Sequence, residues 1–459
     1  MKTDTIAAIA TAMAGSGIGI VRISGEEAVS ITDQIFHMPG GKKLSDMETH
    51  TIHYGHIRDG EEVIDEVMVL LMRGPRSYTR EDTVEIDCHG GVYVMKRILE
   101  TVIKYGARPA EPGEFTKRAF LNGRIDLSQA ESVIDVISAK NEFALKSSMK
   151  QLSGAVSDAV KEIRGEILHE IAFIESALDD LEHISLDGYG ERLELTIEGA
   201  VDRIEKLLAS SDNGRILKEG ISTVIVGKPN AGKSSLLNTL LGEERAIVTE
   251  IAGTTRDVLE EQINLNGIIL NIIDTAGIRD TDDIVEKIGV DKARKYVKDA
   301  DLILYVVDAS TNLDENDGEI MELLHGRRTI VLLNKSDLMP LTTAEDIRVH
   351  VDKDCPVISI SAREQKGIDV FTEQIRKMFF RGEVTFNDEV YITNIRHKTA
   401  LQEALSSLHL VEQSIADGMP EDFYSIDLMN AYEVLGTIIG EAVEDDLVNE
   451  IFSKFCMGK

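Results

Sequence analysis

The sequence feature that most constrains the fold is a glycine-rich loop. Gly227–Ser234 reads G-K-P-N-A-G-K-S and matches the pattern G-x-x-x-x-G-K-[S/T]. The apolar run Ile221–Val226 precedes it, and Ser235–Leu241 after it has a helical pattern. In such a strand, loop and helix, backbone N–H groups surround a β-phosphate, Lys233 reaches the β- and γ-oxygens, and the Ser234 hydroxyl is placed for Mg²⁺. The segment therefore predicts a phosphate-binding loop.

Further short aliphatic runs follow the loop and predict strands buried on both faces of a mostly parallel sheet. They are Ile268–Ile273, Leu302–Val307, Ile330–Leu333 and Val357–Ile360. Helical patterns alternate with these runs. We therefore expect a Ras-like α/β domain with a phosphate loop over residues 220–382.

Two motifs end strands of this predicted sheet. Asp274-Thr275-Ala276-Gly277 follows one strand, so that Asp274 can hold the Mg²⁺ shell and the Gly277 N–H can sense a γ-phosphate. Asn334-Lys335-Ser336-Asp337 follows another. The Asp337 carboxylate can accept hydrogen bonds from guanine N1–H and N2–H₂ together, a pairing that adenine does not offer. The second motif therefore predicts guanine specificity.

Two further segments complete the pattern. Ser361-Ala362-Arg363 follows the last strand, where a backbone N–H can meet guanine O6. Thr254-Thr255-Arg256-Asp257 lies between the phosphate loop and Asp274, as a switch segment does, and one of its threonines would supply a second hydroxyl to Mg²⁺. Each motif alone is weak, but their order along the chain predicts a GTPase.

One position departs from the small signalling GTPases. Ile278 follows Asp-Thr-Ala-Gly, where those proteins carry a glutamine that positions water. An isoleucine side chain cannot orient water. The acidic segment that follows either supplies a carboxylate for this task or is a solvated loop without a catalytic role. Its candidate carboxylates are Asp280, Asp282, Asp283 and Glu286.

The rest of the chain has a different organisation. Residues 1–118 mix strand patterns, such as Val63–Leu71 and Thr83–Cys88, with an amphipathic helix at 92–105, which predicts an α+β domain. Residues 119–219 and 383–459 have apolar residues at helical spacing. The economical interpretation is one discontinuous α-helical domain with the α/β domain inserted into it.

Charge and cysteine content exclude several classes of protein. The chain has 49 Lys and Arg against 81 Asp and Glu, a net charge of −32, so a general positive face for nucleic acid is excluded. Its three cysteines exclude a disulfide framework and fit a reducing, cytoplasmic compartment. The sequence contains no apolar run near the ~20 residues of a membrane span. Asp4 stands where a signal peptide would be basic, so we expect no cleaved signal.

Together with two segments outside the α/β domain, these motifs resemble the MnmE (TrmE) family of bacterial tRNA-modification GTPases over the full length. The segments are Pro112–Thr116 with Arg118–Gly123, and the terminal Cys456-Met457-Gly458-Lys459. The resemblance implies an N-terminal domain that dimerises and binds 5-formyltetrahydrofolate or another tetrahydrofolate. It also implies a heterotetramer with the flavoprotein MnmG (GidA). Together they add an aminomethyl or carboxymethylaminomethyl group at C5 of the wobble uridine of certain tRNAs, with the one-carbon unit from a folate.

The resemblance also implies roles for individual residues. The GTPase domains would dimerise and be activated by potassium instead of an arginine finger. The potassium contacts would be Asn230, Thr249, Ile251 and Thr254. The Mg²⁺ hydroxyls would be those of Ser234 and Thr255, and Glu286 would be the catalytic residue that positions water. The folate contacts would be Arg22, Glu81, Arg124 and Lys459.

Motifs and resemblance together give one set of residues expected to bind GTP. It comprises Asn230, Ala231, Gly232, Lys233, Ser234, Ser235, Thr249, Glu250, Ile251, Ala252, Gly253, Thr254, Thr255, Asp274, Thr275, Ala276, Gly277, Asn334, Lys335, Asp337, Ser361, Ala362 and Arg363.

The chain departs from the family pattern at one position of the folate set and at the position before Glu81. Arg124 stands where the family usually has lysine, and Arg80 stands where glycine is common. The thiol of Cys456 is either a nucleophile toward a one-carbon adduct or an unreactive contact in the folate pocket.

Two other function classes are alternatives. A regulatory GTPase of ribosome assembly usually carries a basic RNA-binding module, and the sequence has no basic stripe. A folate enzyme with a purely structural nucleotide domain would not need the complete set of GTP motifs. Folate binding together with fast GTP turnover would separate the three classes. We expect this protein to contact tRNA largely through its partner.

Overall fold

The computed structural model describes residues 4–180, 183, 185, 186, 188–243, 261–273, 297, 300–380, 392–441, 445–455 and 458. The chain forms two compact units. The first comprises residues 1–137, 150–201 and 400–459, and the second comprises 138–149 and 202–399. The multidomain α/β class predicted from the sequence is confirmed, with an N-terminal α+β part, helices, and an inserted domain with a phosphate loop. The boundaries expected after residues 118, 219 and 382 stay predictions.

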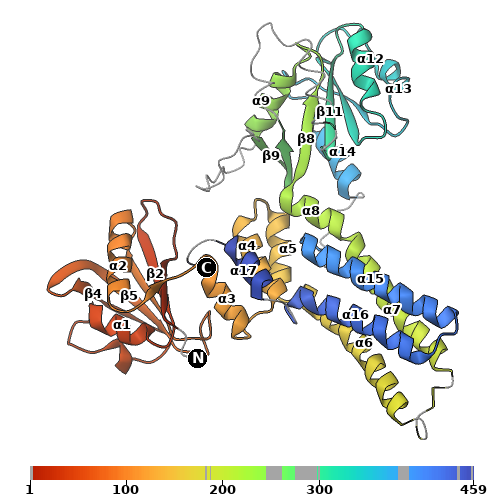
Figure 1. Cartoon of the computed structure of the whole chain (residues 1–459). Helices are drawn as coiled ribbons and strands as arrows, with labels where there is room; N and C mark the ends of the chain where they lie inside the picture. Colours follow the sequence, from red (N-terminus) through yellow and green to blue (C-terminus); the bar gives the residue numbers. More distant parts are fainter. Residues whose placement is uncertain are drawn as a thin grey trace. The chain divides into compact units, whose positions relative to one another are not determined.

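A seven-stranded sheet with the order β3-β4-β5-β6-β2-β1-β7 forms the N-terminal part of the first unit (Figure 1). Its strands are β1 Ile6–Ile9, β2 Ile18–Ser24, β3 Phe36–His37, β4 Thr51–Asp59, β5 Glu62–Met72, β6 Thr83–His89 and β7 Arg108–Pro109. The helical segments between them are α1 Ala28–Ile35, the 3-10 turn η1 Leu44–Asp46 and α2 Val92–Lys104. The strands and the helix predicted at 63–71, 83–88 and 92–105 correspond to β5, β6 and α2.

The two faces of this sheet differ because successive side chains of a strand point to opposite sides. Val67, Val69 and Leu71 of β5 face α1 and α2 and belong to one buried core. The alternate residues face away from these helices. On that side Ile52, Tyr54 and Met68 are 62%, 49% and 47% exposed. Since Ile52 pairs with Leu70 and Tyr54 pairs with Met68 across β4 and β5, the exposed apolar side chains form a continuous patch.

Helices from both ends of the chain complete the first unit. The helices that lie wholly or partly in it are α3 Glu114–Leu121, α4 Leu127–Ser138, α5 Glu142–Leu152, α6 Ala155–Asp179, α7 Tyr189–Ala209, α15 Ile395–Ala416, α16 Glu421–Ile439 and α17 Asp445–Ser453. Helices α6 and α16 lie side by side (Figure 1). Arg164 of α6 is buried, donates from Nε to the Tyr432 carbonyl at 3.0 Å, and lies 4.0 Å above the Tyr432 ring. This contact ties the two halves of the discontinuous helical part together.

The second unit contains a six-stranded sheet with the order β13-β12-β11-β8-β10-β9. Its strands are β8 Ile221–Val226, β9 Glu261–Leu265, β10 Ile268–Ile272, β11 Leu302–Asp308, β12 Thr329–Asn334 and β13 Val357–Ser359. Its further helices are α8 Ser211–Glu219, α9 Lys233–Glu243, α12 Glu315–Glu322, α13 Ala344–Arg348 and α14 Ile368–Phe380. The predicted strands are all present, and neighbouring ones pair in parallel. The edge strand β9, which pairs antiparallel with β10, was not predicted.

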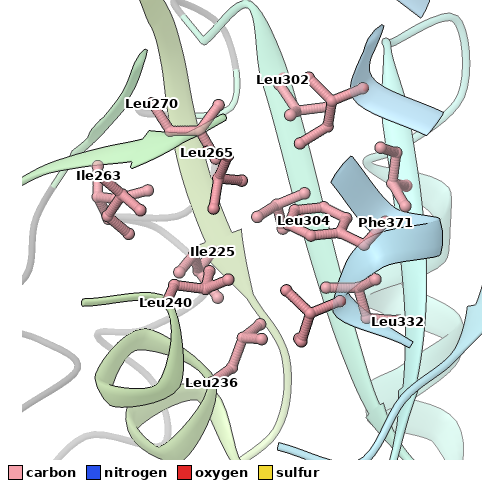
Figure 2. Close-up of a cluster of buried hydrophobic side chains, with 14 of the residues drawn as sticks. Ile225, Leu236, Leu240, Ile263, Leu265, Leu270, Leu302, Leu304, Leu332 and Phe371 are labelled. Atoms are coloured by element: carbon pink, nitrogen blue, oxygen red, sulfur yellow. The ribbon is translucent and has the colours of Figure 1, made fainter. Parts of the chain in front are cut away.

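The core of this domain explains why the aliphatic runs become its inner strands. Ile225 of β8 and Leu304 of β11 pack with Leu236 of α9 and Phe371 of α14 (Figure 2). Burying each such side chain is worth about 1.5–3 kcal/mol relative to leaving it exposed. The packing fixes α9, and therefore the loop that precedes it, against the carboxyl end of β8. In the part of the chain described here, no helix is long and apolar enough to cross a membrane.

Candidate functional site

The backbone of the phosphate loop adopts conformations that glycine permits. Gly227 has φ +149°, and a Cβ there would lie 2.3 Å from the carbonyl oxygen of Val306. Gly232 has φ +96°, and a Cβ there would lie 2.1 Å from Nδ2 of Asn334. Asn230 is left-handed, with φ +61°. Asparagine tolerates this region better than most residues. The loop therefore curls tightly between β8 and α9.

Lys233 begins α9 and its ammonium group turns back into the loop. Its Nζ donates to the carbonyl oxygens of Gly227 and Lys228, both at 2.8 Å. Burial lowers the pKa of Lys233. Because these two partners are neutral carbonyls, an anion in the loop would give this cation a countercharge. Ser234 is half-buried in the first turn of α9, Ala231 is buried, and Ser235 is exposed.

Asn334 connects the phosphate loop with the segment 361–363. It is buried at the end of β12, donates from Nδ2 to the Ala231 carbonyl at 2.9 Å, and accepts the Ala362 N–H at 3.1 Å. Lys335 is left-handed, with φ +63°, and pairs with Asp308 of β11. Two strand-end motifs and the phosphate loop, far apart in the sequence, are thus joined by one amide side chain.

Asp337 lies beside the last of these segments. Its Oδ1 accepts a hydrogen bond from the Ser361 hydroxyl at 2.7 Å. The Ser361 Oγ in turn accepts the Glu364 N–H at 3.1 Å. The Ser361 hydrogen bond lowers the pKa of the Asp337 carboxyl, which therefore stays ionised at neutral pH. Arg363 is exposed next to this pair. A carboxylate fixed in this way suits a ligand edge that carries two N–H donors.

A lysine that sequence reasoning missed anchors the loop. Lys228 Nζ lies 2.9 Å from Asp314 Oδ2 and 2.6 Å from Asp317 Oδ2. The Tyr305 hydroxyl donates to Asp317 Oδ1 at 2.8 Å. These contacts hold the loop against the start of α12. The motif leaves the position of Lys228 free, and the acidic partners are far along the chain, so no pattern signalled the contact.

Several predicted residues lie outside the described part of the chain. They are Thr249, Glu250, Ile251, Ala252, Gly253, Thr254, Thr255, Asp274, Thr275, Ala276, Gly277 and Glu286. Their assignments to GTP, Mg²⁺, potassium and water stay predictions. Among the residues that are described, no group of three or more His, Cys, Asp or Glu side chains is arranged to hold a metal ion.

A second group of predicted residues gathers in the first unit. The guanidinium of Arg22 lies 5.7 Å from the Tyr78 ring centroid, and that of Arg124 lies 4.6 Å from the same centroid. Arg22 Nε also pairs with Glu85 at 2.6 Å across β2 and β6. The structure therefore brings two of the predicted folate contacts to one aromatic ring. Tyr78 itself was not predicted.

Glu81 is held by groups from two other elements. Its Oε2 accepts the Ser24 hydroxyl at 2.8 Å and Arg118 NH1 at 3.1 Å. Arg118 is buried in α3 and pairs also with Glu114. Arg118 belongs to a segment that the sequence singled out, but nothing in the sequence alone indicated Glu81 as its partner.

The C-terminal segment returns to this group. The carbonyl of Gly458 accepts a hydrogen bond from Arg22 NH1 at 3.0 Å. Gly458 has φ +91°, and a Cβ there would lie 2.4 Å from the carbonyl oxygen of Ile9, so only glycine fits this close approach. The predicted Lys459 and Cys456 flank this position in sequence and lie outside the described residues.

Comparison with known proteins gives matches over nearly the whole chain. Residues 5–124 match the family described as GTP-binding protein TrmE N-terminus, and residues 127–456 match the MnmE helical domain. A relative from Lachnoclostridium phytofermentans, named tRNA modification GTPase MnmE, is 61% identical over 100% of both chains. A protein of the same name from Bacillus subtilis is 47% identical over 99% of this chain and 100% of its own.

Among solved structures, the G domain of the FeoB iron transporter of T. maritima is 23% identical, with a TM-score of 0.26. The match covers 34% of this chain and 97% of that chain. A likeness this weak does not bear on function.

Proposed function

The chain belongs to the MnmE family of tRNA-modification GTPases, and from this premise we propose that it hydrolyses GTP as part of the modification of tRNA. The observation that carries the proposal is the union of the phosphate loop, Asn334 and the Asp337–Ser361 pair in one domain. The relatives reported above all bear the tRNA-modification name. This favours the proposal over a regulatory GTPase of ribosome assembly.

In this proposal Asp337 reads the guanine edge and Lys233 binds the β- and γ-phosphates. The half-buried Lys233 ammonium, held by two neutral carbonyls, fits a phosphate ligand. Ser234 and Thr255 would hold Mg²⁺, and Asn230, Thr249, Ile251 and Thr254 would hold potassium. The bound cations would offset phosphate charge as it develops. The remaining residues of the predicted GTP set keep the roles expected from the sequence.

Hydrolysis also needs a group that positions water. Ile278 cannot perform this role, and among the carboxylates that follow we assign it to Glu286, the residue that the family resemblance implies. A carboxylate can hold a water molecule by accepting its proton in a hydrogen bond. This chain would then hydrolyse GTP with a carboxylate and a monovalent cation in place of the glutamine and arginine finger of other GTPases.

We further propose that Arg22, Glu81, Arg124 and Lys459 bind 5-formyltetrahydrofolate or another tetrahydrofolate. The geometry fits such a ligand, since Arg22 and Arg124 lie at one ring and suit the carboxylates of a glutamate tail. The Glu81 carboxylate suits the N–H donors of a pterin. It is held ready by Arg118 and Ser24. Arg124 would bind as a fork, where a lysine would make a point contact. Cys456 would lie near this ligand because of its place in the sequence.

The N-terminal domain, residues 1–118, is proposed to form a homodimer. The exposed patch of Ile52, Tyr54 and Met68 supports this, because an apolar face of this kind marks an interaction surface. Arg22 and Glu85 lie on the same side of the sheet, so that a second copy on this face would approach the folate group. We propose that the rest of the chain divides into two helical parts, 119–219 and 383–459, and a GTPase domain, 220–382.

The remaining parts of the proposal concern partners. We propose a complex with the flavoprotein MnmG that installs an aminomethyl or carboxymethylaminomethyl group at C5 of the wobble uridine, with the one-carbon unit from the folate. The net charge of −32 supports tRNA contact largely through the partner. The scarcity of cysteine supports a cytoplasmic location.

The decisive experiment is mass spectrometry of wobble uridines in tRNA from cells that lack this protein. Loss of the C5 substituent, with recovery on expressing the parent chain, is the expected result. In these cells, neither the Asp337→Asn variant nor the Arg22→Ala variant should restore the modification. If cells that lack the protein contain as much C5-modified wobble uridine as normal cells, the proposal is overturned.

A further inference from the structure

Two arginine guanidinium groups lie within cation–π distance of the Tyr78 ring. The guanidinium of Arg124 lies 4.6 Å and that of Arg22 lies 5.7 Å from the ring centroid. Both distances fall within the ~6 Å over which the negative face of an aromatic ring attracts a cation. Arg22 comes from β2, whereas Arg124 follows the C-terminal end of α3. Tyr78 is therefore the contact through which arginines from two separate elements meet.

The ring itself is fixed by α3. The Tyr78 hydroxyl lies 2.8 Å from the Thr116 hydroxyl. Phe115, the preceding residue of α3, is buried and lies 5.5 Å from the Arg22 guanidinium. Arg22 is further oriented by Glu85, but Arg124 is exposed. A long exposed side chain loses substantial conformational entropy when a ligand fixes it. Stacking on a held ring removes part of that cost before the ligand arrives.

We propose that Tyr78 is a positioning residue that holds Arg22 and Arg124 together for the paired carboxylates of a folate glutamate tail. The inference rests on the proposed folate function of this group. Two guanidinium groups that converge on one anion repel each other in the free protein, and the ring face offsets this repulsion. The aromatic face of Tyr78 makes the contacts with the two arginines, and its hydroxyl only helps to hold the ring against α3.

The first test compares Tyr78→Leu with Tyr78→Phe in the full-length chain, by titration calorimetry with 5-formyltetrahydrofolate. Leucine removes the ring, and we expect about tenfold weaker binding from the loss of two cation–π contacts. Phenylalanine keeps the ring and should bind within about threefold of the parent. Tyr105→Leu is the matched control, because Tyr105 also has a cation, Lys104, 5.7 Å from its ring centroid but contacts neither arginine.

The second test separates positioning from a merely structural role. The primary amide of 5-formyltetrahydropteroate lacks the glutamate with both of its carboxylates and carries no benzoate carboxylate in their place. Tyr78→Leu should weaken binding of the folate by about tenfold and binding of the pteroate amide by less than about twofold. Equal losses for both ligands would overturn the inference. Arg124→Ala, at an exposed position that does not threaten folding, should show the same discrimination between ligands, and its absence would also overturn the inference.

Binding by the parent chain separates a failure of the positioning role of Tyr78 from a failure of the folate proposal. If it binds 5-formyltetrahydrofolate and Tyr78→Leu binds equally well, the positioning role fails while the folate proposal stands. If the parent chain binds neither ligand, the folate proposal fails and the role of Tyr78 fails with it.

Discussion

At the scale of the residue, the proposed guanine contact depends on the Asp337 carboxylate, whose direction is set by a neighbouring hydroxyl. Ser361 donates to one oxygen of Asp337 and leaves the carboxylate charged and fixed. A charged acceptor with a fixed orientation discriminates bases better than a mobile one, because a mismatched base cannot recover its lost hydrogen bonds by side-chain rotation.

Asp337→Asn should exchange the base preference. The asparagine amide pairs with the C2 carbonyl and the N1–H of xanthine, whereas it loses the two charge-assisted bonds to guanine. GTP affinity should fall by about a hundredfold or more, and affinity for xanthosine triphosphate should rise. Fluorescence titration with both nucleotides checks this. Asp354→Asn, at an exposed aspartate elsewhere in the domain, should leave both affinities unchanged. Unchanged GTP affinity in Asp337→Asn would refute the assignment.

Arg22→Ala should remove a principal cation of the proposed folate group. We expect the affinity for 5-formyltetrahydrofolate to fall by about a hundredfold, and Arg22→Lys to retain part of it because the charge remains without the fork. Calorimetry measures both. Arg97→Ala removes an arginine of α2 that pairs with Glu62 and should leave folate binding intact. Intact binding in Arg22→Ala would end the assignment at this position.

At the scale of the element, α3 supports the proposed folate-binding residues along its length. Phe115 contacts Arg22, Thr116 fixes Tyr78, and Arg118 pairs with Glu81. Gly113 is the N-cap that precedes the helix, where φ is +68° and a Cβ would lie 2.7 Å from the Phe452 carbonyl. One short helix thus connects the candidate ligand contacts with the C-terminal helix α17.

Glu114 anchors α3. Its Oε1 accepts hydrogen bonds from NH2 of Arg108 at 2.6 Å and from NH2 of Arg118 at 3.0 Å. Burial alone would raise its pKa, but the hydrogen bonds from Arg108, the Glu111 amide and Arg118 outweigh it and leave the pKa below its usual 4.5. The stabilisation is therefore fully present above pH 4.5 and is lost as the pH falls through the lower pKa of the folded state.

Glu114→Gln should lower the free energy of unfolding by about 2–3 kcal/mol at neutral pH, because the buried carboxylate at this position loses its charge-assisted hydrogen bonds from Arg108 and Arg118. The difference from the parent should shrink below pH 4. Asp4 also has a pKa lowered by Arg108 and titrates in this range, so the comparison between the two proteins isolates Glu114. Denaturant unfolding at several pH values measures the effect. Glu111→Gln, at an exposed neighbour, should not reproduce it.

How much of the fold could be predicted depends on the apolar pattern of each strand. The inner strands of the inserted sheet are continuous aliphatic runs, because both of their faces are buried, and these were located within one or two residues. The edge strand β9 alternates polar and apolar residues over a few positions, and β3 and β7 are two residues each, too short for any periodicity. β4 carries His, Tyr, Gly and Arg and gives no apolar pattern.

Predictability of the candidate site divides in a similar way. Residues in local motifs, such as Lys233 and Asp337, could be predicted from the sequence because motifs for a phosphate loop and for a base contact have a fixed local spacing. Residues that act by touching another side chain were missed. Tyr78 meets Arg124, and Lys228 meets Asp314, across long separations in sequence. Such contacts exist only after folding, and one sequence holds no local pattern that reports them.

At the scale of the whole molecule, the proposed chemistry requires two copies of the chain. Neither Arg256 nor Arg279 occupies an obvious finger position in the sequence, so the charge that an arginine supplies elsewhere has to come from another source. Potassium beside Asn230 can supply it, if switch segments of paired GTPase domains close around the ion. The rate of hydrolysis should then rise with protein concentration, and more so in potassium.

Steady-state GTP hydrolysis in matched potassium and sodium buffers tests this mechanism. The parent chain should be faster in potassium by about 10³-fold or more, because the smaller sodium ion fits the same oxygen cage poorly. Asn230→Ala should lose the difference between the salts but still bind GTP, whereas Asn312→Ala, at an exposed asparagine of the same domain, should keep it. Glu286→Ala should lower the rate strongly with nearly unchanged nucleotide affinity, as expected for a contact made mainly in the transition state. Equal rates of the parent chain in the two salts would exclude the cation mechanism and return Arg256 and Arg279 as candidates.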